Sequence, residues 1–244
     1  MKILEDLVAS IQQYPVKEVF VGIFDTLVWS KNLGLASTIQ EKETPHQGIK
    51  EAGSLITKSA KELAQYVFSK NWLEASLGMA AINSALPIEH EKLKTLNAQE
   101  IILQKGREKV IGIIGHFPFL EEIEQKFKKM YIFEKHPKKN DLREEDIPKF
   151  LPIADLVAIT STSLTNHTFE NIVKCIKKDS YVIMLGPTTP VTPILFDYAI
   201  DAVSGVFIKD KNVPRVIAQV KEATPYRNIK GKEYVTILKE DYID

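Results

Sequence analysis

The 244-residue chain contains one cysteine, Cys175, which excludes a disulfide framework and any cysteine cluster for zinc or iron–sulfur binding. It has no run of about 18 apolar residues, and its first residues do not have the pattern of a signal peptide. We therefore expect a cytoplasmic protein with no membrane partner. An excess of one charge is also missing, since 32 Lys+Arg balance 32 Asp+Glu. Residues 1–106 alone carry 11 basic and 12 acidic residues, so we expect no nucleic-acid partner.

Residues 1–106 predict a small α+β domain. Apolar residues recur with helical spacing over 3–11, and Pro15 ends that helix. Three short β-branched runs then predict an antiparallel meander, over residues 16–24, 26–30 and 34–39.

Two further helices are predicted in this domain, the first over residues 54–69. The second begins after Asn71, and Glu74 three residues later matches a capping box. Its body, residues 75–82, consists mostly of small residues. Such a helix can approach its neighbours closely, so we expect it to be buried.

Residues 107–244 have a different rhythm, in which continuous apolar runs alternate with stretches of helical length. The runs are residues 110–114, 130–133, 156–159, 181–185 and 203–208. Continuous apolar strands separated by helices indicate a parallel sheet covered on both faces. We therefore predict an α/β fold, with the small domain followed by a five-stranded Rossmann-like domain.

Two local features of this second domain add expectations. Acidic residues early and basic residues late favour a helix over 119–129. The β-like run 234–238 could pair with the sheet of the first domain or with a second copy of the chain, which leaves a homo-oligomer open.

Polar or Gly/Pro-rich residues follow four of the predicted strands. In an open parallel sheet, ligands bind beyond the carboxyl ends of the strands, so these residues are candidates for a ligand site. They are Gly115, His116 and Phe117 after the first strand, Glu134 after the second, Thr160, Ser161, Thr162 and Asn166 after the third, and Gly186, Pro187 and Thr188 after the fourth.

The first of these loops does not match a dinucleotide fingerprint. Only Gly112 and Gly115 are present, the third glycine is missing, and Pro118 stiffens the entry to the next helix. Glu134 lies 19 residues after Gly115, close to the spacing of an acid that binds ribose. A nucleoside-like ligand without a pyrophosphate contact therefore stays open, as does a solvated strand end.

Six of the seven residues 160–166 can form hydrogen bonds through their side chains, and a helix is predicted directly after them, over 168–177. Simple capping by Asn166 or Thr168 would explain one residue and leave the others. None of the five histidines has metal-ligand spacing, but His116 and His167 are predicted at the same edge of the sheet. Cys175 shares an apolar helix face and is expected in the core.

Several stretches in this order resemble one family along nearly the whole chain. They are Gly22-Ile23-Phe24, Leu35-Ala36-Ser37, residues 77–83, 112–118 and 159–166. The chain is similar to the domain-of-unknown-function 364 (DUF364) family, labelled for heavy-metal chelation, with its N-terminal companion domain 4213.

The resemblance implies an enolase-N-terminal-like domain over 1–106, a Rossmann-like domain over 107–244, and an active site in the cleft between them. It assigns His116, residues 160–166 and residues 186–188 to that site, and Asn83 is our candidate from the first domain. Asn83 could equally be a helix cap or turn residue before Pro87.

Three functions stay open. The first is binding of a small polar ligand, a metal chelate or a pterin-like compound, in the cleft, with His116 as general acid or base in an enzyme of metal-chelate metabolism. The second is a non-catalytic carrier of a divalent metal or metallo-ligand that uses His116, Glu134 and His167. The third is a Rossmann enzyme with an adenosyl or nicotinamide cofactor. The sequence assigns no cofactor and no reaction.

Overall fold

A computed structural model describes residues 1–39, 48–138 and 140–243, and it confirms the antiparallel meander near the N-terminus. The strands are β1 (Glu18–Val21), β2 (Asp25–Trp29) and β3 (Leu33–Ser37), in the order β1-β2-β3. Because side chains alternate along a strand, β2 packs Leu27 on one face and Val28 on the other. The polar stretch 40–53, whose Pro45 and Gly48 predict a loop, lies largely outside the described residues.

Helix α1 (Lys2–Ser10) confirms the first helix, whereas the helix predicted over 54–69 is wrong in part. That segment is broken into η1 (Leu55–Thr57), α2 (Ala60–Ala64) and η2 (Gln65–Phe68). The break has a local cause: Lys58 is extended, and Ser59 starts a new helix through a capping box with Glu62.

Helix α3 (Trp72–Ala85) is buried along most of its length, as its small residues predict. A Cβ at Gly78 would lie 2.1 Å from the backbone nitrogen of Val67, so only glycine allows this close approach. Asn71 caps the helix by accepting from the Leu73 N–H, but the predicted capping box is wrong. The Glu74 carboxylate accepts from the Lys50 N–H and the Ser69 hydroxyl instead.

The large sheet has six strands rather than five. They are β4 (Val110–Ile114), β5 (Lys129–Phe133), β6 (Leu156–Thr160), β7 (Tyr181–Leu185), β8 (Ala202–Phe207) and β9 (Glu233–Leu238). Their order is β5-β4-β6-β7-β8-β9, with the first five parallel and β9 antiparallel to β8. The run 234–238 therefore joins the large sheet, and the expectation that it pairs with the small sheet is wrong.

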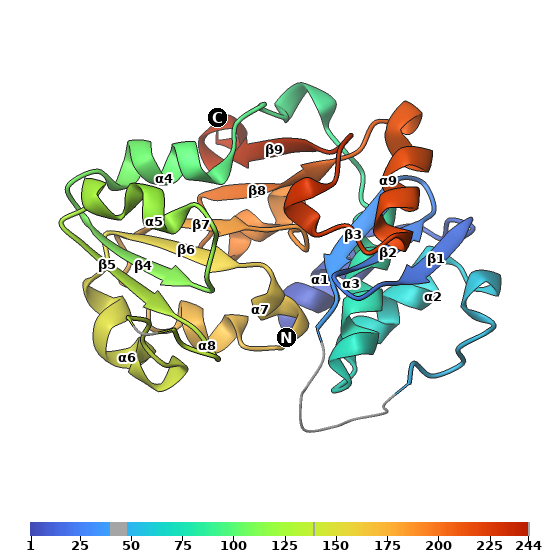
Figure 1. Cartoon of the computed structure of the whole chain (residues 1–244), viewed down its shortest axis with the longest axis horizontal. Helices are drawn as coiled ribbons and strands as arrows, with labels where there is room; N and C mark the ends of the chain where they lie inside the picture. Colours follow the sequence, from blue (N-terminus) through green and yellow to red (C-terminus); the bar gives the residue numbers. More distant parts are fainter. Residues whose placement is uncertain (40–47, 139, 244) are drawn as a thin grey trace.

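Helices cover both faces of the large sheet, as the continuous apolar strands predict (Figure 1). Helices α4 (Ala98–Gly106) and α5 (Leu120–Ile123) pack on one face. The other face carries α1 together with α6 (Ile147–Phe150) and α8 (Phe169–Val173). The α/β fold class, a small antiparallel sheet beside a mostly parallel one, is therefore confirmed.

Two predicted helices of the second domain are shorter than expected. Residues 119–129 form only α5 and η4 (Glu124–Lys126), because Phe127 is extended and Lys128 already donates to the Lys109 carbonyl. Of the late lysines, Lys126 lies in η4, whereas Lys128 and Lys129 lie beyond the helical turns. Likewise, α8 ends at Val173 rather than at residue 177.

Helix α9 (Val213–Lys221) packs on the face of the small sheet opposite α3. A third apolar cluster joins Leu27 and Leu35 of the small sheet to Val216 and Val220 of α9. The two sheets are thus tied together from the far end of the chain, and the domain boundary at residue 106 stays a prediction. In the described part of the chain, no helix has both the length and the apolar character needed to cross a bilayer.

Candidate functional site

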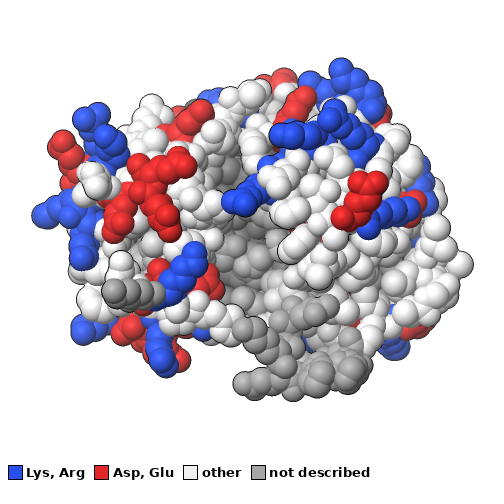
Figure 2. All heavy atoms as spheres, in the orientation of Figure 1, with Lys and Arg blue, Asp and Glu red and all other residues white. Residues whose placement is uncertain are grey.

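A cavity of about 350 Å³ lies at the carboxyl ends of β4, β5 and β6. The chain order of the strands reverses here, because β4 has β5 on one side and β6 on the other, and such switch points form ligand crevices. Ile39 and Trp72 reach the cavity from the first domain, so both halves of the chain line it. The face drawn in Figure 2 is hollowed between the lobe of β4 and β5 and the lobe of the small sheet and α9.

The loop after β4 is shaped by Gly115. Its φ of +98° favours glycine, and a Cβ at this position would lie 3.1 Å from Cβ of Thr160. The Gly115 N–H donates to the Phe133 carbonyl, N···O 2.9 Å, which continues the pairing of β4 with β5. The chain then turns toward the cavity, where His116 and Phe117 line the wall.

His116 lies beside the carboxylate of Asp141. Its Nδ1 is buried and 3.3 Å from Oδ2 of Asp141, without the alignment of a hydrogen bond. Asp141 is held in a turn because its Oδ2 accepts from the Lys138 N–H, and Leu142 then bridges to Phe133 at the end of β5. Asp141 therefore lies on the Nδ1 side of the imidazole ring, away from Nε2.

Hydroxyl groups line the opposite wall, where β6 runs into α7 (Thr162–Thr165). Oγ1 of Thr160 and Oγ1 of Thr162 are 2.9 Å apart and share a hydrogen bond. Ser163 is 1% exposed, and its hydroxyl has no hydrogen-bond partner. Asn166 also lines the cavity, but its Oδ1 accepts from the Thr168 N–H and hydroxyl, so capping explains part of its role.

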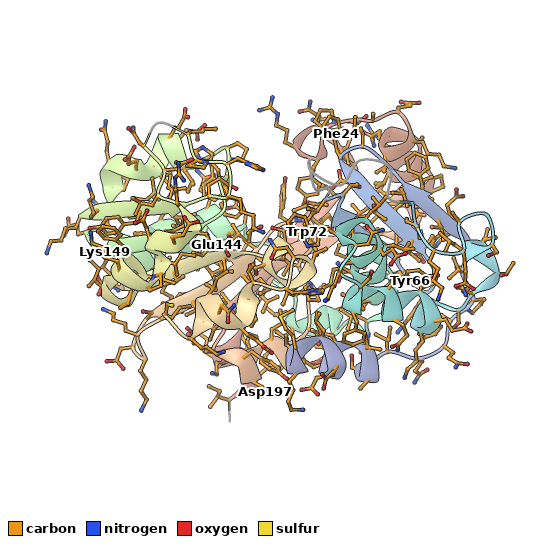
Figure 3. The ribbon with its side chains drawn as sticks, turned by 90° about the horizontal axis from the view of Figure 1, so that it is seen from below. Phe24, Tyr66, Trp72, Glu144, Lys149 and Asp197 are labelled. Atoms are coloured by element: carbon orange, nitrogen blue, oxygen red, sulfur yellow. The ribbon has the colours of Figure 1, made fainter. Side chains whose placement is uncertain are left out.

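Trp72 of the first domain and Lys135 of the second contact each other at the cavity. The Lys135 ammonium lies 4.4 Å from the centroid of the Trp72 ring, a cation–π contact. Glu134, directly after β5, lines the same cavity. Trp72 lies between Glu144 of the large-sheet lobe and the helices of the small domain, while Phe24 marks the small-sheet lobe across the gap (Figure 3).

The structure brings together seven of the twelve residues that the sequence predicts for the site. They are Gly115, His116, Phe117, Glu134, Thr160, Thr162 and Asn166. The other five, which do not line the cavity, are Asn83, Ser161, Gly186, Pro187 and Thr188.

Two of those five, Asn83 and Thr188, hold the domains together. The Asn83 side-chain amide donates to the carbonyls of Leu35 and Thr188, and the Thr188 hydroxyl accepts from the Ser37 N–H. Ser161 is fully buried beside Gly186, and its hydroxyl has no partner.

A pair of His116 and His167, which their positions at one sheet edge left open, does not form in this cavity. His167 does not line the cavity, and its Nε2 lies 2.8 Å from the carbonyl of Val67 in the small domain. Cys175 is half-buried against the core, as predicted, with its Sγ near the Asn171 carbonyl. Among the residues that the structure describes, no three His, Cys, Asp or Glu side chains come together as metal ligands.

Sequence reasoning missed Asp141, Trp72 and Lys135, and it did not single out Ser163 within residues 160–166. Trp72 and Lys135 come from different domains, and no local pattern predicts their contact. Ser163 lies inside the polar stretch 160–166, but only its burial without a partner singles it out. Asp141 has no sequence signal beyond a turn, because the bridge of Leu142 to β5 decides where it lies.

A second titratable cluster lies outside this cavity, where β2 meets the C-terminal segment. Asp25 is 2% exposed, and one of its carboxylate oxygens has no hydrogen-bond partner. Burial raises the pKa of Asp25 to about 7, against the opposing effect of the Lys232 ammonium. Burial also lowers the pKa of Lys232, whose ammonium donates to the Ile229 carbonyl and lies over the rings of Tyr226 and Tyr234.

Comparison with known families agrees with this architecture. The DUF364 family model, described as "Putative heavy-metal chelation", matches residues 97–239, more than half of the chain. The chain belongs to the DUF364 family. A second model with the same description, DUF4213, matches residues 4–86, as the motifs of the sequence predict.

Relatives of this DUF364 protein share its length and fold. An uncharacterised protein of Methanocaldococcus jannaschii is 27% identical over 208 residues, which cover 82% of this chain and 79% of the relative. A DUF364 protein of unknown function from Desulfitobacterium hafniense superimposes with a TM-score of 0.83 at 25% identity, over 98% of this chain and 97% of the other. One from Pyrococcus horikoshii shows the same fold, with a TM-score of 0.82 at 21% identity over 97% and 98%.

Proposed function

We propose that this DUF364 protein binds a small polar organic ligand, a metal chelate or pterin-like compound, in the cavity between its two domains. The neutral polar lining carries the proposal: Thr160, Thr162 and Asn166 line the cavity, and Ser163 beside them has a buried hydroxyl without a protein partner. A cavity of about 350 Å³ is near the lower end of the usual range, which suits a small ligand.

The donors around the cavity favour an organic ligand over a bare metal ion. Thr160, Thr162, Ser163 and Asn166 are neutral hydrogen-bonding groups, which recognise polar edges of organic molecules. A bare heavy-metal ion, as the family description suggests, would need soft donors or several protein ligands. The described side chains do not form such a ligand set. In this proposal a metal enters only as part of the ligand.

In the catalytic form of this proposal, His116 moves a proton on the bound ligand. Asp141 beside Nδ1 would hold the ring orientation and leave Nε2 facing the ligand. Trp72 and Lys135 would limit the access of water by closing the mouth between the domains.

A thermal-shift panel on chelator-treated protein tests the proposal. The panel contains zinc, nickel, cobalt and iron salts, pterins, and adenosyl and nicotinamide cofactors, alone and combined. A ligand at 100 times its Kd adds about 2.7 kcal/mol, which raises Tm by roughly 5–11 °C at this chain length.

Ser163→Ala and Ser161→Ala provide a matched pair, since both remove a buried hydroxyl without a partner but only Ser163 lines the cavity. A shift with an organic compound that weakens in Ser163→Ala and persists in Ser161→Ala supports the proposal. A shift with a metal salt alone would favour the carrier function instead. Equal loss in both variants, or no shift with any compound, would contradict cavity binding.

A further inference from the structure

Glu134 occupies a distinctive place in the large sheet. It directly follows β5, and the register Ile114↔Phe133 places it beside Gly115 at the point where the strand order reverses. Its N–H donates to the Leu142 carbonyl, N···O 3.0 Å, which fixes the backbone. Its Oε1 accepts from the Lys135 N–H at 2.9 Å, so the carboxylate is oriented before any ligand binds.

A carboxylate in this place is suited to a pair of neighbouring hydroxyl groups. Its oxygens together accept several hydrogen bonds, and each bond to a charged acceptor is stronger than a neutral one. In doubly wound sheets, an acid about 20 residues beyond the first strand binds the ribose hydroxyls, and Glu134 lies 19 residues after Gly115. The structure adds what the spacing alone lacks, a cavity that Glu134 lines.

The same cavity is poorly suited to a phosphate. The loop after β4 holds Gly115 alone instead of a glycine-rich turn, and α5 behind it has only four residues, too few to provide a helix dipole. The charged residues of the lining are the carboxylates of Glu134 and Glu144 and the Lys135 ammonium, which lies over Trp72. A phosphorylated ligand would therefore meet more negative than positive charge.

We propose that the cavity ligand is a ribonucleoside-type molecule, without a 5′-phosphate, whose 2′- and 3′-hydroxyls bind the Glu134 carboxylate. This inference rests on the proposed function, because it names the ligand class of the same cavity. The ring of Trp72 at the mouth provides an apolar face beside the sugar position.

The test is calorimetric titration of the full chain with adenosine, guanosine, cytidine, uridine and S-adenosylmethionine. Each nucleoside is compared with its 2′-deoxy analogue and its 5′-monophosphate. We expect at least one ribonucleoside or S-adenosylmethionine to bind, the deoxy analogue to bind about 10-fold or more weakly, and the monophosphate to bind no better than the nucleoside.

Glu134→Gln assigns the effect to the carboxylate. It should weaken ribonucleoside binding about 10-fold or more and weaken binding of the 2′-deoxy analogue less, because that analogue makes only the 3′-hydroxyl contact with the carboxylate. Glu121→Gln, an exposed carboxylate on α5 outside the cavity, is the matched control and should bind as the wild type does.

Three results would overturn the inference. The first is equal binding of ribo- and deoxynucleosides, and the second is tighter binding of monophosphates. The third is that no compound in this titration binds, while a pterin or metal chelate gives a Ser163-dependent thermal shift. This result would remove the ribose assignment and keep the proposed function. No binding in the titration and no thermal shift in the panel would remove both the ribose assignment and the proposed function.

Discussion

Asp25 should make the stability of this protein fall as pH rises from about 4 to about 7. Its carboxyl is 2% exposed on β2, and burial raises its pKa from 3.8 to about 7. In that window the unfolded chain has released the proton while the folded chain retains it, so the folded state binds more protons. The contribution of Asp25 to stability is therefore complete below the pKa of the unfolded state and is lost as pH rises to the pKa of the folded state.

The size of the effect follows from the two pKa values. One pKa unit corresponds to about 1.36 kcal/mol, so a rise from 3.8 to about 7 amounts to about 4 kcal/mol lost between pH 4 and pH 7. Above about pH 8 the carboxyl is ionised in both states, and its contribution becomes flat.

Urea unfolding of the wild type and Asp25→Asn at pH 4, 5, 6, 7 and 8 measures this contribution. The amide has its own constant packing cost, so the informative quantity is how the difference between the two proteins changes with pH. We expect the variant to gain about 4 kcal/mol relative to the wild type between pH 4 and pH 8.

Two further variants test whether Asp25 causes this pH dependence. Lys232 is the charged group that lowers the pKa of Asp25, so Lys232→Met should extend the loss of stability to higher pH. Tyr226 also faces Asp25, but its pKa is raised well above 10 and it stays neutral throughout. Asp155→Asn is the control, because the hydrogen-bonded ion pair with Lys177 lowers the pKa of this half-buried carboxyl and its profile should parallel the wild type above pH 4. Parallel profiles of stability against pH for Asp25→Asn and the wild type would refute a buried Asp25 carboxyl with a raised pKa.

Two other predictions concern packing and the site. Gly78→Ala should cost more than about 3 kcal/mol, because its Cβ would lie 2.1 Å from the Val67 nitrogen, whereas Gly48→Ala, with open space around it, should stay within about 0.5 kcal/mol in the same urea assay. In ¹⁵N NMR of the imidazole, the neutral His116 ring should carry its proton mainly on Nδ1, and Asp141→Asn should lower the population of this tautomer. An unchanged tautomer population would show that Asp141 does not orient the ring.

Patterns that depend on short-range sequence were predicted well. The meander follows from short β-branched runs, α1 follows from helical spacing, and the five parallel strands follow from continuous apolar runs. The burial of α3 follows from its small residues, since they allow neighbours to approach on every side. One error arose where a chain segment pairs with a distant one, since Lys128 bonds to Lys109 and ends the helix predicted over 119–129. Another was local, since the capping box of Ser59 breaks the helix predicted over 54–69.

The candidate site was predicted in part for the same reason. The carboxyl ends of parallel strands meet at one edge, so His116, Glu134 and Thr160 could be expected together from strand positions alone. Asn83 and Thr188 are polar and near that edge, but they form hydrogen bonds across the domain seam rather than line the cavity.

By itself, the sequence determined the fold class, the family and the edge of the sheet where polar groups gather, because strand type and strand ends are encoded by local residue patterns. Only the tertiary structure decided which of those groups line one cavity, which lock the domains together, and that Asp25 is buried with one carboxylate oxygen unpaired. The physical reason is that burial and hydrogen-bond satisfaction depend on neighbours supplied by distant segments, such as Trp72 for Lys135 and the 226–234 segment for Asp25.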